Sequence, residues 1–364
     1  MPFAWERKEI DTAFAVMVKD LIIEQSMEFG RNRGRPTREK TVNNYFYAIR
    51  RLTGKYPESL ESLTNAFGDY DKVIAKVEKT TDNLNVKRGL LTAVVVFLRT
   101  LVIAGKLDDA VFKPLITQLE DYYRNVNIKY RATITSETKS VKDKKNMLHS
   151  FEDIGDIQKA IQSQLRLNNV LIKGNRINTN RVFTKHDIDL LQQHVVVSLF
   201  YNLPARRLEY GSCKVVSVKD VPQRVDAQKE LPYYEQDNFL VVPKRGIQYE
   251  FHFYNYKTAN CYGLQIIKVP RQLGVILKRW LGVNRTENLF VNPLKGGAMS
   301  NNGLGKYIKK IFKRYYPQKS IGATYLRKAH VTELLKNDTP YKMKADLAQL
   351  MGHSVSMQQG YCKR

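Results

Sequence analysis

The sequence has few cysteines and no long apolar run. Its 364 residues include three cysteines, Cys213, Cys261 and Cys362, with no Cys-x-x-Cys spacing. This argues against a disulfide framework or a cysteine-rich zinc site and fits a reducing compartment. The longest apolar run, residues 90–98, is too short to span a membrane, and the N-terminus lacks the apolar core of a signal peptide. We expect an intracellular protein that is neither secreted nor membrane-inserted.

Acidic residues are also scarce relative to basic ones. The chain has 35 Asp and Glu against 60 Lys and Arg, a net charge of +25. Self-repulsion of this size opposes a compact state unless a polyanion relieves it, and nucleic acid is the obvious polyanion. The alternative, a generically basic soluble protein, explains the charge less well. Hydrophobic residues make up 43% of the chain, which argues against overall disorder.

The length and the patterning predict two domains. A helix at 6–29 and a basic segment at 30–36, equally a DNA-contacting arm or a solvated linker, form the N-terminal part (1–36). An all-α domain (37–130) and a polar, lysine-rich linker (131–148) follow, and a second domain occupies 149–364. In the all-α domain, helical spacing of apolar residues predicts helices at 37–52, 60–67, 69–77, 83–105 and 108–124.

In the second domain the apolar period changes from helical to alternating and back. Helices are predicted at 151–167 and 184–201, and again at 272–281, 302–316, 324–336 and 342–351. Between them, short strands are predicted at 214–219, 238–242, 249–254 and 263–268, with a polar turn at 255–260. The fold class is therefore mainly α with a small antiparallel β-sheet (α+β).

The second domain lacks a grouping of His, Asp and Glu at metal-ligand spacing. A phosphodiester can be opened with metal ions held by carboxylates, or with side-chain cations that stabilise the oxyanion. This domain offers cations at Arg206, Lys257 and Arg327, together with His353 and Tyr361. Each of these residues alone more often has a structural role. Their order, on the expected types of element, favours a joint catalytic role.

That order resembles the tyrosine recombinase/phage integrase family. The motifs are Ala-Arg-Arg-Leu-Glu (205–209), Asn-Tyr-Lys-Thr (255–258) on a hairpin, Leu-Arg-Lys-Ala-His-Val-Thr (326–332), Leu-Met-Gly-His-Ser (350–354), and a later Tyr. The resemblance covers residues 150–364 by motif. Residues 37–125 are similar to that family's core-binding domain by pattern only. It implies a two-domain, C-shaped clamp around duplex DNA, with an all-α core-binding domain and a catalytic domain.

The resemblance implies a role for each matched residue. Arg206, with Arg207 as the close alternative, and Arg327 would hold the non-bridging oxygens of the scissile phosphate. Lys257 would protonate the 5′-oxygen leaving group, and His353 would act as hydrogen-bond donor or general base. Tyr361 would be the nucleophile, forming a 3′-phosphotyrosyl linkage that needs no metal, ATP or other cofactor.

The sequence departs from the family pattern at two points. Thr324 stands three residues before Arg327, where the family usually has His, and Thr can donate a hydrogen bond to phosphate but cannot shuttle protons. His353 and Tyr361 are eight positions apart, a short spacing that a tight turn or delivery of Tyr361 in trans would accommodate.

The resulting expectation is a site-specific recombinase or integrase of a virus or mobile element, acting on double-stranded DNA as a homotetramer. It would work wherever that DNA is, in a prokaryotic cytoplasm, a virus factory or a host nucleus. The alternatives are a type IB topoisomerase and a DNA-binding protein with a decayed active site. Further DNA contacts are expected at Arg207, Thr324 and Lys328, at Arg31, Arg33, Arg35 and Lys40, and in the linker at Lys139, Lys142, Lys144 and Lys145.

Overall fold

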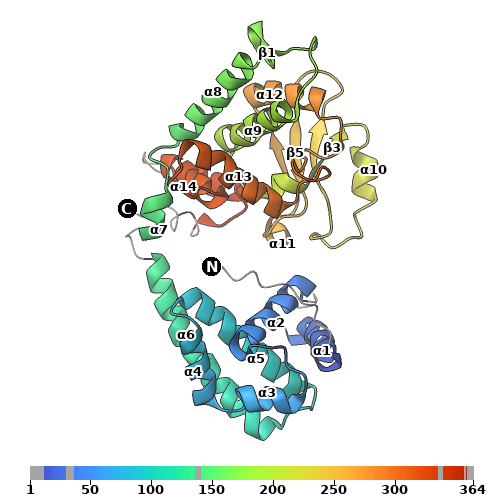
Figure 1. The fold of residues 1–364 in the computed structure, drawn as a ribbon. Coiled ribbons are helices and arrows are strands. Elements are labelled where there is room, and N and C mark those ends of the chain that lie inside the picture. Colours follow the sequence, from blue (N-terminus) through green and yellow to red (C-terminus); the bar gives the residue numbers. More distant parts are fainter. Residues whose placement is uncertain (1–11, 30–36, 136–140, 335–338, 356–357, 359–364) are drawn as a thin grey trace. The chain divides into compact units, whose positions relative to one another are not determined.

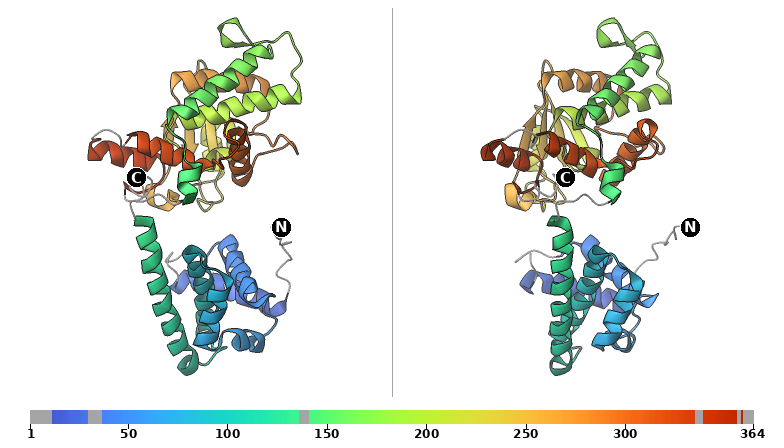
Figure 2. Two further views of the ribbon diagram at one scale, coloured as in Figure 1. Left: turned by 60° about the vertical axis from the view of Figure 1, so that its left-hand side comes forward. Right: turned by 90° about the vertical axis from the view of Figure 1, so that its left-hand side faces the viewer.

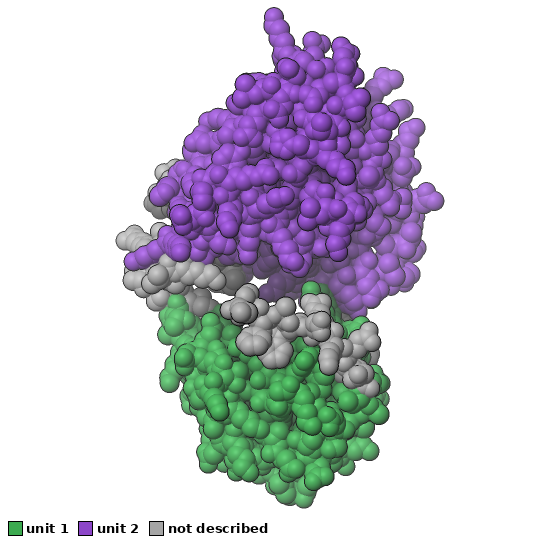
Figure 3. All heavy atoms as spheres, in the orientation of Figure 1, with its two compact units in different colours: residues 1–136 green, residues 137–364 purple. Residues whose placement is uncertain are grey.

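The computed structural model describes residues 12–29, 37–135, 141–334, 339–355 and 358 (Figure 1). The chain divides into two compact units, Met1–Ser136 and Glu137–Arg364 (Figure 3). Each has its own hydrophobic core, since no cluster of buried apolar side chains draws described residues from both. The division falls inside the segment 131–148. None of the described helices is long and apolar enough to cross a membrane.

The described part of the first unit is helical. Its elements are α1 (Ala13–Phe29), α2 (Glu39–Thr53), α3 (Leu60–Phe67), α4 (Tyr70–Thr80), α5 (Leu84–Ile103) and α6 (Asp109–Thr135). Helix α5 is central, because α1, α2, α4 and α6 all pack against it. Phe46 and Phe97 meet edge to face in this core, with ring centroids 4.7 Å apart.

Side-chain caps explain where several of these helices begin. Ser59, Asp69 and Asn83 each accept a hydrogen bond from a backbone N–H in the first turn of α3, α4 and α5. Such caps satisfy donors that have no partner inside the helix. Helix α6 continues to Thr135, beyond the predicted end at residue 124, because no glycine or proline interrupts residues 125–135.

The second unit is also mainly helical, which confirms the predicted mainly α fold with a small sheet. Its helices are α7 (Val141–Asn146), α8 (Glu152–Leu167), α9 (Lys185–Asn202), α10 (Val221–Asp226), α11 (Ala259–Tyr262), α12 (Arg271–Val283), α13 (Asn301–Tyr315), α14 (Ala323–Leu334) and α15 (Tyr341–Leu350), with short 3₁₀ turns η1 (Lys173–Asn175) and η2 (Glu209–Ser212). Helix α9 is buried on nearly all sides and packs against α8, α12 and α13. Helices α8 and α9 lie side by side in every view (Figure 2).

The main sheet has the order β3 (Cys213–Ser217), β4 (Asn238–Val242), β5 (Glu250–Phe253) and β6 (Gln265–Lys268). The predicted antiparallel pairing is correct for β4–β5 and β5–β6 and wrong for β3–β4, which are parallel. A parallel pair needs a crossover, and the long connection between β3 and β4, which contains α10, provides it. A separate two-stranded ribbon joins β1 (Leu171–Ile172) to β2 (Arg176–Ile177).

One face of the main sheet packs on the large core of the second unit, and the other face is covered over β3 and β4. Leu240, Phe251 and Phe253 belong to the large core that includes α9 and α12. Phe239 and Val241 form a smaller cluster on the opposite face, against which α10 packs Val221. On β6, Gln265 and Ile267 face the large core, whereas Ile266 and Lys268 are exposed on the other side.

Candidate functional site

Three residues that are far apart in the sequence meet at the C-terminal end of α15. Arg206 lies in the extended segment between α9 and η2, Arg327 is on α14, and His353 follows α15. All three are buried, with 0%, 2% and 2% of their surface exposed. Backbone carbonyls of Leu350 and Met351 accept from the two guanidiniums.

The Arg206 guanidinium is fixed on several sides. Its Nη1 donates to the Leu350 carbonyl oxygen at 2.7 Å and to Gln265 Oε1 on β6. Its charged carbon lies 4.1 Å from the ring centroid of Phe253 and 4.9 Å from that of Tyr256. Cations are attracted to the faces of such rings, so this side chain is oriented before any ligand binds.

Arg206 nevertheless keeps unused hydrogen-bonding capacity. Its Nε and Nη2 atoms have no hydrogen-bond partner among the described residues. Glu209, three residues later, is also buried, yet no hydrogen bond joins these two described side chains. Leaving a buried charged donor unsatisfied costs about 1–3 kcal/mol or more, so the site favours an anionic oxygen ligand. A planar guanidinium suits the paired oxygens of a phosphate.

Arg327 links this site to the histidine. Its Nη1 donates to the carbonyl oxygens of Ala205, at 3.1 Å, and Met351, at 3.0 Å, and its Nη2 lies 2.9 Å from His353 Nδ1. A guanidinium only donates hydrogen bonds, so His353 Nδ1 accepts and the ring proton is on Nε2. Because Ala205 adjoins Arg206, the two arginines are coupled through one short backbone segment.

His353 is uncharged in this setting. Burial lowers its pKa to about 3, and the positive charges of Arg327 and Arg207 contribute in the same direction. The neutral ring with its proton on Nε2 is a hydrogen-bond donor at neutral pH. It is therefore better suited to donate to a phosphate oxygen than to accept a proton.

Lys257 lies in the β5–β6 connection, just before α11, as the sequence predicts for a hairpin lysine. Its side chain is exposed and has no hydrogen-bond or ion-pair partner among the described residues. Its neighbours are held: Tyr256 OH donates to the Gly263 carbonyl at 2.7 Å, and Thr258 Oγ1 donates to the Gly352 carbonyl at 3.0 Å. The second bond ties the lysine loop to the residue before His353.

Three further residues were predicted to contact DNA beside the catalytic positions, and they differ in their exposure and in their partners. Thr324 is exposed on the first turn of α14, one turn before Arg327. Arg207 is half-buried, and its charge acts on His353. Lys328 Nζ pairs with Asp143 Oδ1 of α7 at 2.6 Å, so it is already neutralised.

The remaining predicted residues lie elsewhere or outside the described residues. Lys40 is exposed on α2, and Lys144 and Lys145 are exposed on α7. Lys142 is on α7, but its side chain is outside the described part. Tyr361, Arg31, Arg33, Arg35 and Lys139 also lie outside the described residues. Among the residues that are described, no three His, Cys, Asp or Glu side chains gather as a metal ion would require.

Sequence reasoning missed Gln265, and it included Gly352 in a motif without giving it a role. Gln265 Nε2 donates to the Gln349 carbonyl at 2.6 Å while its Oε1 accepts from Arg206, so it bridges β6, Arg206 and α15. A polar residue at an inward position of an alternating strand was the available signal. Gly352 has a φ of +64°, which turns the chain so that His353 follows directly beside Arg327.

Comparison with known proteins gives little at the level of sequence. No family model and no curated protein matches this chain. Solved structures that are similar to it include a crystal structure of XerA recombinase, with 14% sequence identity, a TM-score of 0.35, and coverage of 95% of this chain and 93% of that one. A likeness of this degree carries no weight for function.

Proposed function

We propose that this protein is a site-specific DNA recombinase of the integrase type, which cuts and rejoins DNA strands through a covalent bond to Tyr361. The observation that carries the proposal is the pair of buried guanidiniums, Arg206 with unsatisfied donors and Arg327 beside a neutral His353. A phosphodiester would satisfy the free Arg206 donors and spread its developing negative charge over both cations.

The proposed reaction is a reversible exchange of oxygen atoms on phosphorus. The phenolic oxygen of Tyr361 attacks the scissile phosphate, its proton passes to water, and the bond to the 5′-oxygen breaks. Lys257 donates the proton that the 5′-oxygen needs to leave as a hydroxyl. A free phenol has a pKa of about 10, so the neighbouring cations help it to attack at neutral pH. Rejoining reverses these steps with another strand's 5′-hydroxyl, which requires no external energy source.

His353 and Thr324 have supporting roles in this proposal. His353 donates its Nε2 proton in a hydrogen bond to a non-bridging oxygen, and Thr324 donates from its hydroxyl to a neighbouring phosphate oxygen. Because Thr324 cannot shuttle protons, Lys257 alone supplies the leaving-group proton. Both units bind duplex DNA, the first through basic residues such as Lys40, and four copies assemble to exchange strands between two duplexes of a mobile element or virus.

The decisive experiment is capture of the covalent adduct. A pool of nicked duplexes with random sequence is incubated with the protein, denatured, and retained on a filter only where DNA is bound covalently. Wild type is expected to retain DNA of an enriched sequence, Tyr361→Phe to retain none while still binding DNA, and Tyr341→Phe to match wild type. Tyr341 is a suitable control because it is exposed, 72%, and lies outside the site.

Other results of this experiment would identify one of the two alternative functions. An adduct without sequence enrichment, together with relaxation of supercoiled plasmid, identifies a type IB topoisomerase. DNA binding without any adduct from wild type identifies a DNA-binding protein whose active site has decayed. Mass photometry on the enriched sequence tests the tetramer, and a complex that stays monomeric would contradict it.

A further inference from the structure

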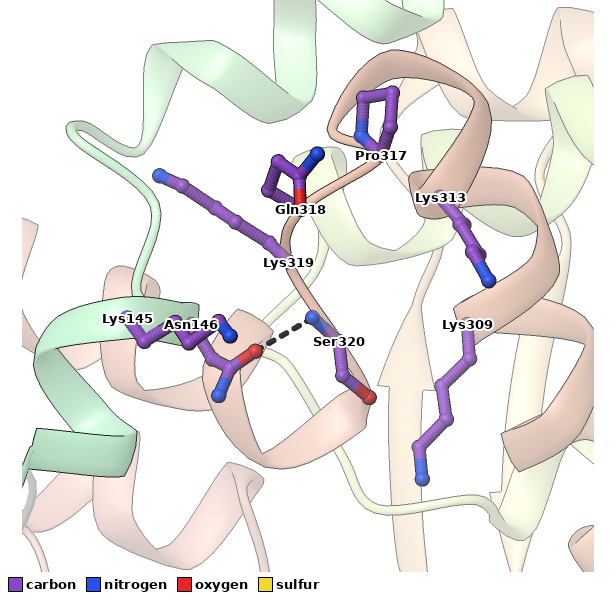
Figure 4. A pocket seen from close by; sticks show the side chains of 8 residues that line it. All are labelled: Lys145, Asn146, Lys309, Lys313, Pro317, Gln318, Lys319 and Ser320. Atoms are coloured by element: carbon purple, nitrogen blue, oxygen red, sulfur yellow. Dashed lines mark hydrogen bonds between the residues drawn. The ribbon is translucent and has the colours of Figure 1, made fainter.

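The second unit has a pocket that the proposed active site does not use. It is a half-open hollow of about 340 Å³ between α7, the C-terminal half of α13 and the segment 317–320 (Figure 4). Its lining includes four lysines, Lys145, Lys309, Lys313 and Lys319, and no carboxylate. Figure 4 shows Lys309 and Lys313 extending from the same side of α13.

Hydrogen bonds from the segment 317–320 to α7 and to the residues just after it hold the wall of this pocket. The Ser320 backbone N–H donates to Asn146 Oδ1 at 2.5 Å. Lys319 Nζ donates to the Met147 carbonyl oxygen at 2.8 Å and lies 3.3 Å from His149 Nε2. Lys319 is thus a fixed part of the wall, and its ammonium charge is not cancelled by an acid among the described residues.

The other three lysines carry charge that the described residues do not balance. Lys145, Lys309 and Lys313 are exposed and have no ion-pair partner in the described part of the chain. Asp143, the acid nearest to Lys145 along α7, is paired with Lys328 instead. Lys309 and Lys313 are one turn apart on α13, a like-charge spacing that costs about 0.2–0.5 kcal/mol in a helix.

The pocket adjoins the helix that carries Arg327. Helix α14 begins three residues after Ser320, and Arg327 lies in its second turn. The Lys309 stem packs against this junction, since a Cβ on Gly322 would lie 3.3 Å from Lys309 Cε. A polyanion that reaches Arg327 along α14 has this lysine-lined pocket at the start of the same helix.

We propose that this pocket binds phosphate oxygens, and that their source is the DNA backbone beside the cleaved bond. The choice of DNA as the source rests on the proposed function. Lysine ammonium groups are flexible point charges that neutralise phosphate without a fixed geometry. Each phosphate so neutralised releases counterions and steepens the salt dependence of DNA binding, by about 0.9 in the logarithmic slope.

Helix α13 provides a matched control for the test. Lys306 and Lys310 have the same spacing as Lys309 and Lys313 and are also exposed, but they do not line the pocket. The double variants Lys309→Ala/Lys313→Ala and Lys306→Ala/Lys310→Ala therefore remove equal charge from one helix. Circular dichroism checks that both fold.

The first measurement is the salt dependence of duplex DNA affinity by fluorescence anisotropy, in the Tyr361→Phe background so that no cleavage occurs. The Lys309→Ala/Lys313→Ala variant is expected to reduce the slope of log affinity against log salt concentration by about 1–2. The Lys306→Ala/Lys310→Ala control is expected to reduce it by less than half as much. Equal reductions by the two pairs would mean diffuse surface charge and would overturn the pocket.

The second measurement separates the sources of phosphate. Pyrophosphate is titrated into the DNA-free protein by calorimetry at low salt. In one outcome, pyrophosphate binds to the wild-type protein and not to the Lys309→Ala/Lys313→Ala variant, while the salt dependence of DNA binding is the same for both. That result assigns the pocket to a free phosphate compound and overturns DNA as the source. If wild type forms no adduct but the slopes still differ, the recombinase proposal fails and the pocket stands.

Discussion

Gln265 orients Arg206 without neutralising it. An acid at this position would fix the guanidinium equally well but would compete with phosphate for its charge. The amide accepts from Arg206 through one atom and donates to the Gln349 carbonyl through the other. Gln265 therefore adds no negative charge beside Arg206, and it holds the end of α15 in register with this side chain.

Replacement of Gln265 by Leu is expected to weaken both the fold and the reaction. It leaves a charged donor of Arg206 and the Gln349 carbonyl with fewer partners, which costs about 1–3 kcal/mol of unfolding free energy. With Arg206 free to reorient, the rate of adduct formation at saturating DNA is expected to fall on the order of tenfold, about 1.4 kcal/mol. Single-turnover kinetics well below the melting temperature measures it, with the exposed Gln272→Leu as control. An unchanged rate would show that Gln265 is purely structural.

At the residue scale, the sequence predicts the charged and histidine side chains of the site, but not the groups that hydrogen-bond to them. Arg206, Arg327 and His353 stand in motifs whose order could be recognised, and the structure brings them together. Their holders are largely backbone carbonyls of Leu350 and Met351, which every sequence possesses. These carbonyls point at the arginines because of the way α15 ends, with Gly352 at a positive φ, and the sequence does not show that conformation.

At the scale of elements, helix boundaries are predictable where a capping residue begins the helix and a glycine ends it. Helix α3 was predicted with its observed bounds because Ser59 caps it and Gly68 ends it. The direction of β3 relative to β4 was not predictable, because alternating apolar residues give the same pattern in parallel and antiparallel strands. What fixed it was α10, a six-residue helix too short to show a helical period.

Helix α12 depends on one glycine for its position against the connection between β4 and β5. A Cβ on Gly274 would lie 2.4 Å from the Ile247 backbone oxygen, whereas a Cβ on Gly282 of the same helix meets nothing within 4 Å. Gly274→Ala is therefore expected to lower the unfolding free energy by about 1–3 kcal/mol, since backbone must move. Gly282→Ala is expected to raise it by up to about 1 kcal/mol.

Trp280 provides the signal for this comparison. It is buried in α12, with 1% of its surface exposed, and donates its indole N–H to the Leu289 carbonyl at 2.7 Å. Since the chain has two tryptophans, a Trp5→Phe background makes Trp280 fluorescence specific for the second unit during urea denaturation. Equal midpoints for the two alanine variants would contradict the close packing of α12 on Ile247.

At the scale of the whole molecule, ionisable groups are distributed unequally between the two units. All six histidines lie at residue 149 or later, in the second unit. Burial lowers the pKa of His194 to about 3 and of His330 to about 4, with smaller contributions in the same direction from Arg279 and Arg327. With the pKa of His353 at about 3, three neutral histidines are built into the second unit.

Mild acid is consequently expected to destabilise the second unit and spare the first. Between the folded pKa values of about 3–4 and the unfolded value of about 6.5, the unfolded chain binds more protons, so unfolding free energy falls as the pH falls. The loss begins near pH 6.5 and grows toward pH 4. In the first unit, hydrogen bonds from Lys19 and Lys87 hold the pKa values of the Glu39 and Glu78 carboxyls below the ordinary 4.5, so those groups stay charged at pH 5.

Hydrogen–deuterium exchange of the full chain, compared at pH 7 and pH 5 after correction for intrinsic rates, resolves the two units by peptide. Protection is expected to drop by about tenfold or more in α9, which contains His194, and to stay constant in α5. Replacing His194 by Gln removes one protonation site, so the drop in α9 is expected to shrink although the variant is less stable at pH 7. A uniform loss of protection in both units would show that net charge, and not these buried rings, governs the acid response.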